Sequence, residues 1–135
     1  MKILVIGSGG REHAIVDAIS RNPKAERIFV APGNGGTAGQ ATNLPIASDN
    51  VTALRDFARS EKIDLTFVGP EVPLSLGIVD RFRSDGLTIV GPDMENARLE
   101  SSKTYSKQRQ AEWFWYRGVI NTGKSFHRYE YSARH

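Results

Sequence analysis

The sequence predicts an α/β domain in which a parallel β-sheet carries helices on both faces. Short, uninterrupted runs of aliphatic and β-branched residues alternate along the chain with longer segments that have helical periodicity. Uninterrupted apolar strands are typical of a parallel sheet covered on both faces, because neither side of such a strand meets water. Four of the five apolar runs end directly at glycine or proline, as strand-to-helix turns often do.

The strands are predicted by their composition and by the turn residues that follow them. KILVI, at the start of the chain, is mostly β-branched and ends at glycine, and RIFVA ends at a Pro-Gly-Asn turn. DLTFV and LTIV both run into Gly-Pro, whereas the fifth segment is short and has the weakest pattern. We therefore expect strands over residues 2–6, 27–31, 43–47, 64–68 and 87–90.

The helices are predicted by apolar residues that recur at helical spacing. We expect them over residues 11–20, 51–60, 74–84 and 94–100, the last one short. The stripe expected to face the sheet in the first helix consists of Ala14, Ile15, Ala18 and Ile19. The stripe of the second helix consists of Val51, Leu54, Phe57 and Ala58, and that of the third of Leu74, Ile78, Val79 and Phe82.

Four loops should meet at one edge of this sheet. They follow the predicted strands at residues 7–12, 31–37, 68–73 and 90–93. Parallel strands have their carboxyl ends at the same edge, and ligands of open α/β sheets bind beyond that edge. The functional site is therefore expected among these loops.

The first loop, GSGGRE, has the composition of a phosphate-binding turn. Gly7, Gly9 and Gly10 allow a tight turn and a close approach of a ligand, because they have no Cβ. The N–H groups at the start of the next helix attract anions, Ser8 offers a hydroxyl donor, and Arg11 offers positive charge. The alternative is a tight strand-to-helix turn without a ligand.

Two departures argue against a dinucleotide in this loop. The fingerprint G-x-G-x-x-G needs a third glycine where Glu12 stands. The second strand ends in Val-Ala-Pro and not in the acidic residue that holds a ribose 2′-hydroxyl. Residues 118–125 match the spacing of a P-loop, but their surroundings predict neither the strand nor the helix it needs, so we interpret the match as fortuitous.

The composition predicts one cytoplasmic domain with an unusual tail. The 135 residues include no cysteine, and no apolar stretch is long enough for a signal peptide or a membrane span. His13 has no paired nucleophile or second ligand, so we predict no catalytic residue and no metal site. Residues 1–107 hold thirteen basic and thirteen acidic residues, so the net charge of +3 belongs to residues 108–135. That tail also holds most of the aromatic residues, namely Trp113, Phe114, Trp115, Tyr116, Phe126, Tyr129 and Tyr131.

Four linked motifs lie within the first 107 residues, about four-fifths of the chain: VIGSGGREHA, VAPGNGGTA, DLTFVGPEVPLSLGIVDRF and ESSKTYSK. In this order and at this spacing they resemble phosphoribosylamine–glycine ligase, a family of the ATP-grasp superfamily. The resemblance implies a Rossmann-like domain that precedes the ATP-grasp domains. It also implies an ATP-dependent reaction that joins glycine to 5-phosphoribosylamine through a glycyl phosphate in purine biosynthesis. The family's ATP and its magnesium or manganese are held mainly by later domains.

The resemblance also implies roles for individual residues. Carried over by motif, Ser8, Gly9 and Gly10 would hold the 5-phosphate of the substrate, next to Arg11. Asn34 and Glu71 would border the ribose, since a carboxylate can accept hydrogen bonds from two vicinal hydroxyls. Lys103, in ESSK, would lie near the ATP phosphates.

Some of these residues also have purely structural alternatives. Asn34 follows Pro-Gly and is therefore a common turn residue, and Glu71 can be a solvated acid of its loop. Arg11 and Glu12 can form structural pairs with neighbouring residues without touching a ligand.

The resemblance ends near Lys107. We expect residues 1–102 to form the substrate-binding domain, and residues 103–135 to begin an ATP-grasp linker and continue as an atypical tail. The tail is either a product of frameshift or truncation, or a genuine extension of a standalone module that binds a sugar phosphate or a nucleic acid. Nucleic acid is the weaker partner because the charge is small, and no membrane partner is expected. Without the later domains, we expect binding of a phosphoribosyl ligand but no ligase activity from this chain alone.

Overall fold

The computed structural model describes residues 1–94, 96 and 97, all of which lie in one compact unit. These residues form a five-stranded sheet with the order β3-β2-β1-β4-β5, in which every pairing is parallel. The strands are β1 (Lys2–Gly7), β2 (Arg27–Pro32), β3 (Thr42–Asn43), β4 (Leu65–Val68) and β5 (Ile89–Val90). The predicted α/β class is confirmed. The predicted boundary at residue 102 and the tail lie outside the described residues.

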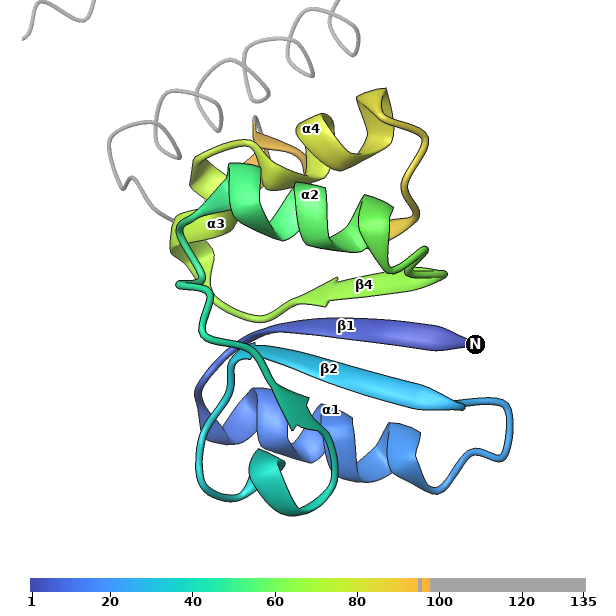
Figure 1. Ribbon diagram of the computed structural model, residues 1–135. Helices are drawn as coiled ribbons and strands as arrows, with labels where there is room; N and C mark the ends of the chain where they lie inside the picture. The colour runs from blue at the N-terminus through green and yellow to red at the C-terminus, as the bar shows by residue number, and fades with distance from the viewer. Residues whose placement is uncertain (95, 98–135) are drawn as a thin grey trace, which may run out of the picture. The chain divides into compact units, whose positions relative to one another are not determined.

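Helices cover both faces of the sheet. On one side lie α1 (Gly10–Ser20) and the short 3₁₀ helix η1 (Thr37–Gly39), and on the other lie α2 (Val51–Ser60), α3 (Glu71–Ser75) and α4 (Ile78–Ser84) (Figure 1). No helix of the described residues is long and apolar enough to cross a membrane.

Strand β1 supplies apolar side chains to both faces. Leu4 and Ile6 belong to the buried cluster that includes residues of α2, α3 and α4, whereas Ile3 and Val5 pack with Val16 of α1. All four β1 side chains are at most 5% exposed. This double burial explains why the strand is an uninterrupted apolar run in the sequence.

The third predicted helix is divided in two. Residues 74–84 keep helical periodicity, and Leu74, Ile78, Val79 and Phe82 are buried as expected. However, α3 ends at Ser75, and Gly77 adopts a left-handed conformation with φ of 80° before α4 begins. A left-handed glycine just after a helix ends it, because glycine adopts this conformation without a Cβ clash. The periodicity does not register this break because the apolar face continues across it.

The face predicted for the first helix is confirmed only in part. Ile15 and Ile19 are half-buried and pack against the cluster on this side of the sheet. Ala14 and Ala18 are exposed, however, and the fully buried side chains of α1 are Val16 and Glu12. The weak strand is shorter than predicted and begins earlier, at Thr42, where it pairs with Phe29 of β2. In the second helix, Leu54 and Ala58 are buried, as predicted.

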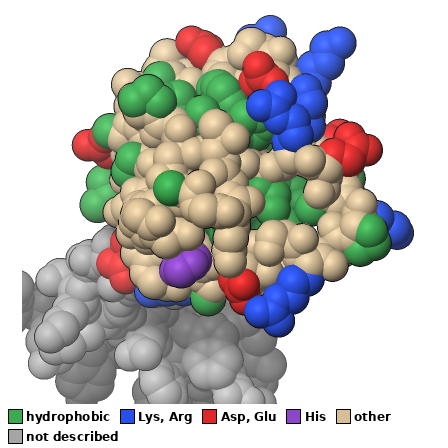
Figure 2. Space-filling model, turned by 60° about the horizontal axis from the view of Figure 1, so that its bottom comes forward, with side chains coloured by type: hydrophobic (Ala, Val, Ile, Leu, Met, Phe, Trp, Pro, Cys, Tyr) green, Lys and Arg blue, Asp and Glu red, His purple; other side chains and the backbone are tan. Residues whose placement is uncertain are grey.

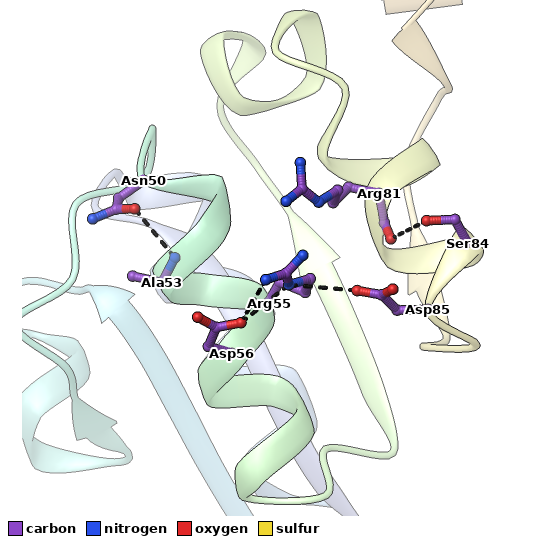
Figure 3. A network of polar contacts seen from close by, with 7 residues as sticks. All are labelled: Asn50, Ala53, Arg55, Asp56, Arg81, Ser84 and Asp85. Atoms are coloured by element: carbon purple, nitrogen blue, oxygen red, sulfur yellow. Dashed lines mark hydrogen bonds and ion pairs between the residues drawn. The ribbon is translucent and has the colours of Figure 1, made fainter.

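A polar network joins α2 to the end of α4 (Figure 3). Arg55 donates from Nη2 to Asp56 Oδ1 at 2.8 Å, and its Nε lies 3.4 Å from Asp85 Oδ2. The hydrogen bond with Asp56 raises the pKa of Arg55 above its usual range, so the guanidinium stays charged. At the other end of α2, Asn50 caps the helix by accepting the N–H of Ala53 at 3.2 Å.

Candidate functional site

A cavity of about 400 Å³ lies at the carboxyl edge of the sheet, where β1 and β4 end. The strand order changes direction at this point, since β2 and β3 lie on one side of β1 and β4 and β5 on the other. Such a switch point is where open α/β sheets bind ligands. The cavity is lined by Gly7, Ser8, Gly9, Gly10, Arg11, Glu12, Ser48, Gly69 and Pro70.

The first turn of α1 faces this cavity. Gly9 is the N-cap residue, with extended backbone angles, and Gly10, Arg11 and Glu12 are the first three helical residues. The N–H groups of a first helical turn have no acceptor within the helix and carry the positive end of its dipole. Gly10 and Arg11 are exposed, and a Cβ at Gly10 would meet no atom within 4 Å. An anion can therefore reach these backbone groups without a steric barrier.

Glu12 is the buried acid of the site, with 5% of its surface exposed. Its Oε2 accepts the N–H of Gly9 at 2.7 Å, so one donor of the glycine loop is already satisfied by the chain itself. A Cβ on Gly7 would lie 2.6 Å from Glu12 Cγ, and a Cβ on Gly69 would overlap the carboxyl group. Both glycines therefore provide the space that the Glu12 side chain fills.

This packing gives a steric reason why the loop departs from the dinucleotide fingerprint. Glu12 stands at the position of the third glycine, and its carboxyl group occupies the crevice between the loops after β1 and β4. A pyrophosphate group in the crevice would meet this carboxylate at close range, and like charges repel.

Asn34 fastens the loop after β2 to the glycine loop. Its Nδ2 donates to the carbonyl of Ser8 at 2.9 Å, while its Oδ1 accepts the N–H groups of Gly36 and Thr37 at 2.8 and 3.0 Å. The carbonyl of Asn34 in turn accepts from Asn43 Nδ2 at 2.8 Å. Asn34 therefore positions Ser8, which lines the cavity, and makes the contacts of its structural alternative as a turn residue. Asn34 itself is not among the lining residues, and its role at the ribose stays a prediction.

The structure brings four of the predicted site residues together, because Ser8, Gly9, Gly10 and Arg11 all line the cavity. Glu71 is exposed at the first position of α3 and does not line it, although the adjacent Pro70 does. Lys103 lies outside the described residues. The predicted roles of all these residues in binding stay predictions.

Sequence reasoning missed two residues that line the cavity, Glu12 as a buried acid and Ser48. The signal for Glu12 was its place three residues after the N-cap, where glutamate commonly accepts the N-cap N–H. Ser48 lies in the segment between β3 and α2, and no local pattern shows that this segment returns to the carboxyl edge.

A second cavity, of about 650 Å³, lies between the start of α2 and α4, away from the loops after β1 and β2. It is larger, but the acids that line it, Asp49 and Asp80, are exposed, and the N-terminal turn of α2 beside it is already capped by Asn50. The smaller cavity, with its glycine loop and buried acid, is therefore the better candidate. On the face shown in Figure 2, basic side chains lie in small groups toward the rim, interspersed with acidic ones. Among the described residues, no group of three or more His, Cys, Asp or Glu side chains is arranged to hold a metal ion.

Comparison with known proteins identifies the family. The family model described as phosphoribosylglycinamide synthetase, N domain, matches residues 1–100. A phosphoribosylamine–glycine ligase of Escherichia coli strain K12 is 53% identical over 109 residues, which cover 79% of this chain and 25% of that protein. One from Caldanaerobacter subterraneus is 46% identical over 132 residues, which cover 96% of this chain and 30% of that protein. The second match therefore includes residues of the tail beyond Lys107.

The solved structures agree with the sequence matches. The crystal structure of a phosphoribosylamine–glycine ligase from Thermotoga maritima superposes with a TM-score of 0.58 at 26% identity, and covers 84% of this chain and 25% of that one. The chain thus spans about a quarter of the length of the curated relatives it matches. It belongs to the family of phosphoribosylglycinamide synthetase N domains.

Proposed function

We propose that this domain binds the phosphate and ribose of 5-phosphoribosylamine for a ligase that joins this substrate to glycine with ATP in purine biosynthesis. The observation that carries the proposal is the cavity of about 400 Å³ between the ends of β1 and β4, at the first turn of α1. The names of the relatives, phosphoribosylamine–glycine ligases, support the choice of substrate.

In this proposal the phosphate binds the free N–H groups of Gly10 and Arg11, and the Arg11 guanidinium and the Ser8 hydroxyl add further donors. The N–H of Gly9 is not counted among these donors, because Glu12 accepts it. Asn34 and Glu71 stay candidates for the rim that borders the ribose.

In this proposal, ATP, magnesium and glycine bind to other parts of the enzyme. The described residues offer no carboxylate cluster that fits a divalent ion, and Lys103 lies outside them. We therefore derive no chemical step through ATP from these residues. The cytoplasmic location expected from the composition also stays a prediction.

The proposal is tested by NMR titration of the 135-residue chain with ribose 5-phosphate. We expect the amide signals of Gly10 and Arg11 to shift in a saturable manner. Gly10→Asp should abolish this response, because it puts a negative charge at the phosphate position, where a side chain otherwise has room. Gly39→Asp is the matched control, since it adds the same charge in open space at the end of η1. Absence of a response at Gly10 and Arg11, or equal loss in both variants, would contradict the proposal.

A further inference from the structure

The hydrogen bonds of Glu12 leave one of its two oxygens without a partner in the protein. Oε2 accepts the N–H of Gly9, but Oε1 accepts no hydrogen bond from the described residues. No described Lys, Arg or His side chain forms an ion pair with Glu12 either. Only 5% of the surface of Glu12 as a residue is exposed, and a single hydrogen bond compensates for only part of the hydration lost on burial.

The free oxygen opens into the cavity. Every buried side-chain nitrogen or oxygen of the described residues has a hydrogen-bond partner. Oε1 has none, so it is not buried and must reach accessible space, and Glu12 lines the cavity at the switch point. It sits beside Gly69, where a Cβ would overlap it. The cavity thus contains free donors on the first turn of α1 and a free acceptor on Glu12.

We propose that Oε1 of Glu12 accepts a hydrogen bond from a hydroxyl or amino group of the same ligand whose phosphate binds Gly10 and Arg11. Glu12 is then a specificity-determining residue, and this inference rests on the proposed function. A ligand that carries both a phosphate and a nearby donor satisfies both halves of the cavity. A phosphate without a donor leaves Oε1 unpaired, and a pyrophosphate places added negative charge against it.

Glu12→Gln tests this role. Glutamine has the same shape, and its side-chain oxygen can still accept the Gly9 N–H, which leaves an NH₂ group in the position of Oε1. The charge and the free acceptor are lost while the helix cap is retained. Glu26→Gln is the matched control, because it removes a negative charge from an exposed residue at the start of β2, at the opposite edge of the sheet.

The probes are ribose 5-phosphate, which has hydroxyl donors, and methyl phosphate, which has none on its carbon. The dissociation constants are measured from the amide shifts of Gly10 and Arg11. We expect Glu12→Gln to raise the dissociation constant of ribose 5-phosphate about tenfold to a hundredfold, because a hydrogen bond to a charged group is lost. Methyl phosphate should bind the variant at least as well as the original chain. Glu26→Gln should leave both constants unchanged.

The outcomes separate this inference from the proposed function. If Glu12→Gln weakens the binding of both probes equally, or of neither, the carboxylate is only a helix cap and the inference is overturned. A response of Gly10 and Arg11 in the original chain would still support the phosphate site. If neither probe shifts Gly10 and Arg11 in the original chain, both proposals fail. Should Glu12→Gln not fold, the carboxyl carbon signal of Glu12 in the original chain decides. It should shift with ribose 5-phosphate and stay in place with methyl phosphate, and any other result overturns the inference.

Discussion

The two faces of the sheet are held by different interactions. Among the described residues, thirteen buried apolar side chains form the cluster on the face of α2, α3 and α4, whereas five form the cluster on the face of α1. Helix α1 buries one apolar side chain, Val16, and its first turn is held by the hydrogen bond between Glu12 and Gly9. The first face depends almost entirely on apolar burial, whereas the second combines a smaller apolar cluster with polar contacts at the first turn of α1.

This difference indicates where each face is vulnerable. Apolar burial contributes roughly in proportion to area and tolerates small shifts of position. Hydrogen bonds depend on distance and direction, so a displacement of a few tenths of an ångström changes them. The polar contacts at the first turn of α1, which border the candidate site, should therefore be sensitive to small displacements of the Glu12 carboxyl group.

The largest effect is expected from Phe82→Ala. Phe82 is fully buried on α4, and its removal leaves a large cavity, so we expect a loss of about 3–5 kcal/mol in the free energy of unfolding. Ile15→Ala, on the half-buried side of α1, should cost about 1 kcal/mol. Urea unfolding of both variants measures the contrast. Equal losses would mean that the two faces do not differ in the way described.

Gly69→Ala should destabilise the candidate site by displacing Glu12. The new Cβ overlaps the Glu12 carboxyl group, which must swing away and leave the Gly9 N–H unpaired, at a cost of about 1–3 kcal/mol. Gly10→Ala, for which the structure has open space, should cost nothing or stabilise by about 0.5 kcal/mol.

A double-mutant cycle sharpens this prediction. In the background of Glu12→Ala, the carboxyl group that the new Cβ would overlap is absent, so Gly69→Ala should cost little. The changes in the free energy of unfolding should therefore be strongly non-additive. Thermal and urea unfolding of the four chains give the coupling. Additive losses would show that Gly69 is needed for a reason other than Glu12.

Substitutions at Asn34 test the contact between the loop after β2 and the glycine loop after β1. Asn34→Ala removes the donor to the Ser8 carbonyl and the acceptor of Gly36 and Thr37, and should cost about 1–2 kcal/mol. Asn34→Asp keeps the acceptor and loses only the donor, so it should cost about half as much. Equal losses in urea unfolding would show that the contact with Ser8 is the only stabilising one.

The side of the sheet covered by α2, α3 and α4 is also the part of the fold that could be predicted most fully from the sequence. The buried residues of α2 and α4 follow helical spacing, so the periodicity identified them correctly even across the break at Gly77. On α1 the fully buried side chains are Glu12 and Val16, four residues apart, and an apolar stripe does not predict an acid at an inward position.

The same reasoning applies to the site. The glycine loop was visible in the sequence because glycines and a helix start are local features. The partners that complete the cavity, Ser48 and Gly69, come from distant segments, and only the folded chain brings them to Glu12. Ligand chemistry that depends on such a non-local arrangement could not be predicted from spacing alone.

The smallest effect is expected at an exposed ion pair on α1. Arg21 Nη2 lies 2.6 Å from Asp17 Oδ2, four residues earlier, but the Arg21 side chain is 76% exposed. Water and salt screen such a pair, so Arg21→Gln should lower the free energy of unfolding by about 0.3–0.5 kcal/mol, and less in high salt. Unfolding in low and high salt measures this difference. A loss above that of Asn34→Ala would contradict the view that polar contacts between loops, and not surface charges, stabilise this side of the sheet.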